Sequence, residues 1–238
     1  MLSAYDWIKT LHIAVGVVAL IGFWSAGLAR KGSPLHRRAG QIFLLAMTGI
    51  LITGVPMAAY KLEQGHPVTA AFLGYLLVIT ATGVWTGWRA IADKRDVRRY
   101  TGPVYVALAG LSLLSGAAIL ALGLRIGAPL LTGFSSIGLF IGADLLLKRL
   151  RRERLGARPR WWLIEHYTAM IGNGIATHIA FLGIGLPRLF PAIDGAALHY
   201  AAWFGPLLVA IGAKLWFDRR WRAPQPATVG ARAPAQIG

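Results

Sequence analysis

The sequence predicts an all-α, polytopic membrane protein of seven transmembrane helices, with its N-terminus outside and its C-terminus in the cytoplasm. Three observations lead to this fold class: the composition, the spacing of the apolar segments and the position of the basic residues. Hydrophobic residues make up 56% of the 238 residues and charged residues only 14%, and the mean hydropathy is +0.56. Soluble domains of this length normally carry more charge. The composition therefore indicates an integral membrane protein.

Seven apolar segments of about the length that a 30 Å bilayer core requires, roughly 20 residues each, are separated by polar or Pro/Gly-rich residues. Pro67, Pro103 and Pro129 stand at first-turn positions, where a helix does not need the missing N–H. Residues 1–222 are thus expected to form one transmembrane domain, and the Pro/Ala-rich residues 223–238 a disordered cytoplasmic tail. The seven segments are Tyr5–Leu28, Gly40–Tyr60, Pro67–Trp88, Pro103–Leu124, Pro129–Leu147, Trp161–Leu186 and Ala196–Trp216.

The basic residues set the predicted orientation. All but four of the 25 Lys and Arg residues fall in every second gap between the apolar segments or at the C-terminal end, the exceptions being Lys9, Lys61, Arg125 and Arg188. The positive-inside rule places those basic gaps in the cytoplasm, as expected for a multi-pass protein of the bacterial cytoplasmic (inner) membrane. Because they lie in short loops, the basic residues orient helices and meet anionic headgroups. Membrane lipids are therefore the expected partners of the +16 net charge, and nucleic acid is not.

The chain has no cysteine, which excludes disulfides, iron–sulfur clusters, thiolate metal sites and thioether-attached haem. The remaining candidates for chemistry are six histidines and the few acids at membrane depth. A charged residue at the centre of a membrane helix costs about 2.5 to 3.5 kcal/mol, so intramembrane ionisable groups are read first as functional. A neutral imidazole is a ligand for haem iron, copper or zinc.

The segment Trp161–Leu186 carries the most informative pattern. His166, Met170, Asn173 and Thr177 recur at i, i+4, i+7 and i+11, which places them in one polar stripe along a helix. We expect this stripe to orient a cofactor or to line a small cavity. His178 lies 12 residues beyond His166, about 18 Å further along the helix axis, so these two histidines would serve separate sites near opposite faces.

Each of these histidines has a candidate partner at a similar depth. His12 or His199 could pair with His178 near the outer face, and His36 could pair with His166 near the inner face. Two such pairs would make a protein that binds haem b and transports electrons across or within the cytoplasmic membrane. Zinc or copper are the alternative cofactors. In that case the predicted metal ligands are His12, His178, His199 and His166.

Two other functions stay open. A histidine in a membrane helix is often only an interhelical hydrogen-bond partner, and the chain would then be a non-catalytic accessory or assembly subunit of a larger membrane or redox complex. Asp144, Glu165, His166 and His36 also gather at the predicted inner face. A carboxylate/imidazole zinc site there would make the protein a metal-dependent membrane hydrolase, so an enzymatic activity is also open.

Three stretches of sequence resemble a bacterial family of inner-membrane proteins of unknown function. They are an H-x-x-x-G motif from His12 to Gly16, an H-R-x-x-G motif from His36 to Gly40, and the Trp161-Trp162, His166, Met170 and Ala176-Thr177 pattern with Ala180-Phe181. The resemblance implies a compact multi-helix protein of the inner membrane and implies no reaction.

Overall fold

The structure, a computed structural model, describes residues 3–189 and 195–221. All regular elements in this part of the chain are helices, as the sequence predicts. The long helices are α1 (Ala4–Leu28), α2 (Pro34–Glu63), α3 (Pro67–Ala92), α5 (Pro103–Ile126), α6 (Pro129–Leu150), α8 (Trp161–Ala180) and α10 (Ala196–Trp221). The short ones are α4 (Val97–Tyr100), α7 (Arg152–Gly156), the π-helical turn η1 (Phe181–Gly185) and α9 (Leu186–Leu189).

Local sequence explains where the helices begin. Ser3 and Asp6 form a capping box at the start of α1, in which each side chain accepts a hydrogen bond from the other residue's backbone N–H. Ser33 caps α2 by accepting a hydrogen bond from the His36 N–H at 3.2 Å. This cap explains why α2 begins at Pro34, six residues before the predicted Gly40.

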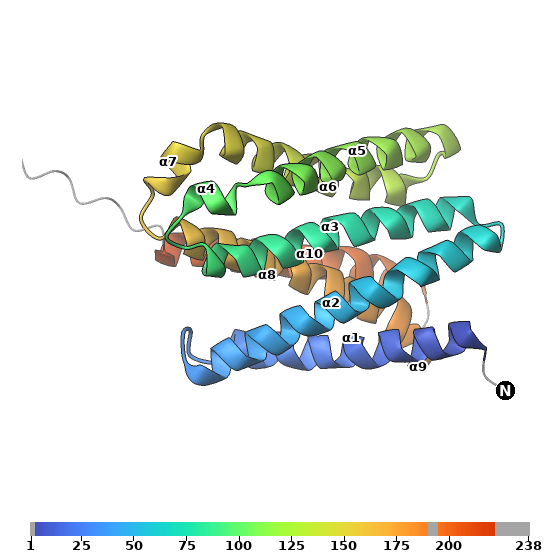
Figure 1. Cartoon of the computed structure of the whole chain (residues 1–238). Coiled ribbons are helices and arrows are strands. Elements are labelled where there is room, and N and C mark those ends of the chain that lie inside the picture. The colour runs from blue at the N-terminus through green and yellow to red at the C-terminus, as the bar shows by residue number, and fades with distance from the viewer. Residues whose placement is uncertain (1–2, 190–194, 222–238) are drawn as a thin grey trace, which may run out of the picture.

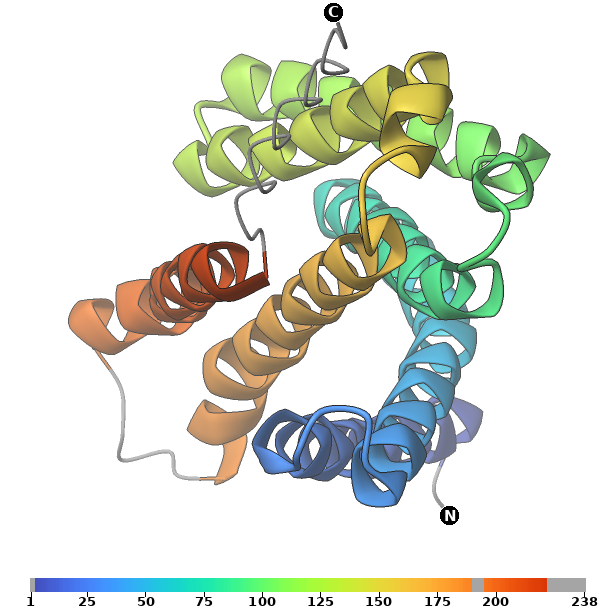
Figure 2. The same ribbon diagram turned by 90° about the vertical axis from the view of Figure 1, so that its left-hand side faces the viewer.

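The helices pack as two hairpins on either side of a central pair (Figures 1 and 2). The hairpin of α1 and α2 contacts α3 through α2, and the hairpin of α5 and α6 contacts the opposite side of α3. Helix α8 packs along α3, also touches α1, and carries α10 on a further side. Figure 2 shows α8, in gold, crossing the middle of the bundle, where it contacts α1, α3 and α10.

Close approach between helices depends on the glycines with small-xxx-small spacing. A Cβ built on Gly142 of α6 would lie 2.6 Å from the Ala109 carbonyl oxygen of α5, and one built on Gly138 would lie 2.7 Å from the Tyr75 ring. On α3, a Cβ at Gly83 would lie 2.9 Å from the Asn173 amide of α8. At Gly138 and Gly142 the nearest atoms include main-chain atoms of α5, so a larger residue there requires movement of that helix, whereas at Gly83 the Asn173 side chain would have to shift.

Six of the long helices are long and apolar enough to cross a membrane: α1, α2, α3, α5, α6 and, from Tyr200, α10. Helix α8, which corresponds to the predicted span Trp161–Leu186, is outside this group because Glu165, His166, Asn173 and His178 lower its hydropathy. Its polar residues face other helices, and three of them, Glu165, Asn173 and Thr177, are buried.

The end of α8 differs from the prediction of one continuous helix to Leu186. The α-helix stops at Ala180, and Phe181–Gly185 continue as a π-helical turn before α9. Pro187 has no N–H to donate to the carbonyl group four residues earlier, and Gly183 and Gly185 permit a wider turn. Both features favour this change of hydrogen-bond register.

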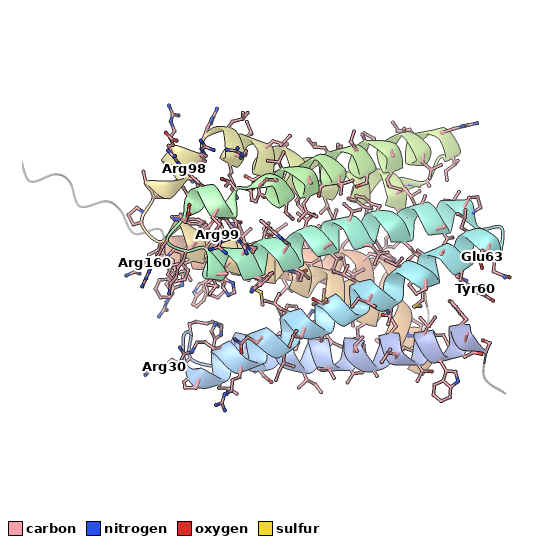
Figure 3. All side chains as sticks on the ribbon, in the orientation of Figure 1. Arg30, Tyr60, Glu63, Arg98, Arg99 and Arg160 are labelled. Atoms are coloured by element: carbon pink, nitrogen blue, oxygen red, sulfur yellow. The ribbon has the colours of Figure 1, made fainter. Side chains whose placement is uncertain are left out.

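The two ends of the bundle differ in charge. One end, here called the basic end, consists of the loops at residues 29–33, 93–102 and 151–160 with the last turn of α10; the opposite end contains the loops at 64–66 and 127–128. Figure 3 shows Arg30, Arg98, Arg99 and Arg160 at the basic end and Tyr60 and Glu63 at the opposite end. The basic loops predicted from the sequence therefore lie at one end of the molecule, and the loops between them in the chain lie at the other end.

Candidate functional site

Two histidines near the basic end are held by main-chain carbonyl groups. His36 lies in the first turn of α2, and its Nδ1 is 2.9 Å from the carbonyl oxygen of Ala26 on α1. His166 lies in the second turn of α8, and its Nδ1 is 2.9 Å from the carbonyl oxygen of Gly87 on α3. Both imidazoles are half-buried.

These contacts fix the tautomer of both imidazole rings. A carbonyl oxygen can only accept, so each Nδ1 carries the hydrogen and donates it. In the neutral ring, Nε2 then keeps its lone pair. Neither Nε2 has a hydrogen-bond partner in the part of the chain that the structure describes. Metal-bound histidines are presented in this way, with one ring nitrogen anchored by a carbonyl group and the other free to coordinate.

His178 has the same anchor but no free nitrogen. Its Nδ1 donates to the Gly174 carbonyl oxygen at 2.7 Å, and its Nε2 accepts a hydrogen bond from the Trp24 indole N–H at 2.9 Å. Phe23 lies edge-on to the ring, with 5.3 Å between the centroids, and occupies the space next to Gly174. The ring is therefore enclosed by aromatic side chains of α1.

The structure does not bring His12 and His178 together. His12 Nδ1 is 2.8 Å from the Thr53 hydroxyl of α2, and that hydroxyl donates to the Gly49 carbonyl oxygen at 2.7 Å, so His12 is the donor to Thr53. His178 instead contacts Trp24, 12 residues or about 18 Å further along α1. The predicted partner His199 has its backbone in α10, but its side chain lies outside the described residues.

The polar stripe of α8 faces α2 and α3. Met170 Sδ lies next to Gly87, the glycine that also anchors His166. The Asn173 side chain is 2% exposed and donates from Nδ2 to the Ala169 carbonyl oxygen, while its Oδ1 has no partner in the described part of the chain. Thr177 donates to the Asn173 carbonyl oxygen at 2.8 Å and contacts Met47 Sδ at 3.3 Å.

The acids at the basic end meet a lysine. Lys148 Nζ lies 2.6 Å from Asp144 Oδ2 on its own helix and 2.8 Å from Glu165 Oε1 on α8. The Tyr100 hydroxyl donates to Glu165 Oε2 at 3.3 Å. Burial and the neighbouring Glu165 raise the pKa of Tyr100 well above its usual value, so this phenol stays protonated as the donor.

The Lys148 ammonium group lies between the carboxylates of Asp144 and Glu165, which were candidate zinc ligands. The His166 ring instead bonds to the Gly87 carbonyl group of α3. Among the residues described here, no three His, Asp or Glu side chains converge in a way that could hold a metal ion. Asp144 and Lys148 form an i, i+4 ion pair on α6. Its extension to Glu165 and Tyr100 was not predicted, because the sequence offers no signal for a contact between α6 and α8.

In comparisons with protein-family models, curated proteins and solved structures, nothing matched this chain. Length and hydropathy establish a multi-pass helical membrane protein. The similarity of the His12, His36 and His166 segments to a bacterial inner-membrane family stays a prediction.

Proposed function

We propose that this protein binds haem b at the basic end of its helix bundle and transfers electrons within the bacterial cytoplasmic membrane. His36 of α2 and His166 of α8 would be the two axial ligands. The observation that carries the proposal is two half-buried imidazoles near the same end of the bundle, each with Nδ1 bound to a carbonyl oxygen and no hydrogen-bond partner at Nε2 among the described residues.

The donor set suits haem better than a metal ion bound only by protein. Haem iron takes four nitrogens from the porphyrin and needs at most two axial ligands from the protein. Two imidazoles from different helices supply those ligands. When bound, the haem would supply reversible one-electron chemistry. A Cβ built on Gly40, one turn after His36, meets no atom within 4 Å. The surface of α2 next to His36 is therefore open.

The protein's own residues would set the orientation and basicity of the ligands. The Gly87 and Ala26 carbonyl groups accept hydrogen bonds from the Nδ1–H groups and hold the rings in place, which would make each Nε2 a stronger donor to iron. Met170, one turn from His166, would pack beside the site as a polarisable apolar side chain. Asn173 and Thr177 lie further along the same stripe.

The proposal includes the topology. We propose that α8 is a seventh span, because 20 residues cover about 30 Å and its polar groups are turned toward other helices. With the basic end in the cytoplasm, the N-terminus is outside and the haem lies near the cytoplasmic face. Its electron donor and acceptor would be further components of a membrane redox complex.

The proposal rests on the inner pair alone, because the structure places His178 against Trp24 and not beside His12. The haem content of the full chain, purified in detergent, tests it. We expect about one haem b per wild-type chain, and loss of the bound haem in His36→Ala and in His166→Ala. His178→Ala is the matched control, because its Nε2 is already bonded to Trp24, and it should keep its haem. Full haem content in both His36→Ala and His166→Ala would contradict the assignment.

A further inference from the structure

A groove opens at the basic end where the α5–α6 hairpin meets α7. Its volume is about 1160 Å³, somewhat larger than ordinary ligand sites. The hairpin forms one edge of the bundle in both ribbon views (Figures 1 and 2). The groove is therefore at the periphery of the molecule and separate from the histidine pair on α2 and α8.

One wall of the groove is apolar. Val106 in the first turn of α5, and Leu146 and Leu150 near the end of α6, provide an apolar wall that belongs to the candidate membrane spans. The Leu150 side chain is 80% exposed, which places an apolar surface at the level where the membrane core ends. This wall suits an acyl chain that lies along the hairpin.

The other wall is cationic. Arg149 at the end of α6, Arg151 between the helices and Arg154 in α7 line the groove, and none of them forms an ion pair in the described part of the chain. The one acidic residue of the lining, Glu153, already pairs with Arg98 at 3.5 Å and Arg152 at 3.7 Å. Three guanidinium groups thus have no counter-ion among the described residues.

We propose that this groove binds an anionic phospholipid, with its phosphate on Arg149, Arg151 and Arg154 and an acyl chain against Val106, Leu146 and Leu150. Guanidinium groups bind phosphate oxygens through paired N–H donors. Basic pockets at the cytoplasmic ends of membrane helices attract anionic headgroups in this way. The apolar wall distinguishes a lipid from a soluble phosphate, because a soluble phosphate has no group to place there.

Lipid titration of the full chain, followed by native mass spectrometry from detergent, tests the proposal. Phosphatidylglycerol should bind the wild type at least tenfold more tightly than phosphatidylcholine. The variant R149Q/R151Q/R154Q should lose about tenfold in phosphatidylglycerol affinity. The variant R149K/R151K/R154K, which keeps the charge but not the paired guanidinium donors, should lose less affinity than the glutamine variant.

The matched control is R30Q/R37Q/R38Q, which removes three exposed arginines at the same end of the bundle, one from the loop before α2 and two from the start of α2. It should bind phosphatidylglycerol within about twofold of the wild type. An equal loss in both glutamine variants would show diffuse charge attraction and overturn the proposal. Displacement of the lipid by millimolar inorganic phosphate would assign the groove to a soluble anion, and no preference for phosphatidylglycerol in the wild type would also overturn it.

Discussion

Hydrogen bonds decide which imidazoles can act as ligands. His166 and His178 lie on the same helix and both donate from Nδ1 to a main-chain carbonyl oxygen. They differ in the second nitrogen, because Trp24 donates to Nε2 of His178, while Nε2 of His166 has no partner among the described residues. The sequence shows two similar histidines, and only the contacts between helices distinguish them.

Lys148 is predicted to be essential for stability. Glu165 is 6% exposed, and in Lys148→Met its carboxylate loses two short contacts with the ammonium group. Removal of one partner from a buried ion pair costs about 3 to 5 kcal/mol, because the remaining charge is unpaired. We expect a clearly lower thermal midpoint in detergent, followed by tryptophan fluorescence.

A double variant provides the control. In Lys148→Met with Glu165→Gln, no charge is left unpaired at Glu165, so much of the lost stability should return. If the double variant unfolds at the same temperature as Lys148→Met, the pair does not stabilise the protein in the manner described.

At the level of the helices, close packing of α5 on α6 requires glycine at defined positions. The substitution Gly142→Ala would place a methyl group 2.6 Å from the Ala109 carbonyl oxygen, a main-chain atom that moves only with its helix. We expect a loss of about 1 to 3 kcal/mol in unfolding free energy from this overpacking. Unfolding of the detergent-solubilised variant measures the loss.

Gly133→Ala is the matched control, since it makes the same change on the same helix. Gly133 is exposed, and a built Cβ meets nothing within 4 Å. Alanine also favours the helix by up to about 1 kcal/mol. This variant should be as stable as the wild type or more so, and equal destabilisation of both variants would refute the packing argument.

The helices were predictable where local signals define them. Prolines mark the starts of α3, α5 and α6 at Pro67, Pro103 and Pro129, as expected from the sequence alone. The short helices α4 and α7 were not predicted, since they contain no apolar repeat, and the π-helical turn after Ala180 was predicted as ordinary helix, since its apolar residues continue the pattern of α8. For the site, the stripe of His166, Met170, Asn173 and Thr177 follows from helical spacing. The anchors at Gly87 and Ala26 depend on tertiary contacts, which sequence spacing does not reveal.

At the level of the whole molecule, the difference in charge between the two ends of the bundle predicts its orientation in the membrane. The loops at the basic end and the loops at the opposite end should be accessible from different sides of the membrane. Because the chain has no cysteine, single cysteines can be introduced without a background signal. Gln64→Cys at the opposite end and Ala157→Cys at the basic end are both exposed, and neither substitution changes the charge.

We expect an impermeant maleimide to label Gln64→Cys on intact spheroplasts and to label Ala157→Cys only after permeabilisation. Equal labelling of both cysteines in intact spheroplasts would contradict the proposed topology. Labelling of Ala157→Cys alone would place the basic end outside.

The reduced-minus-oxidised absorption spectrum of the purified wild-type protein tests the central claim most directly. The proposal predicts a Soret band and a sharp α-band on reduction with dithionite, at about one haem per chain, from a low-spin iron with two imidazole ligands. A colourless, iron-free protein, isolated from cells with sufficient haem and folded by its helical signal, would contradict it.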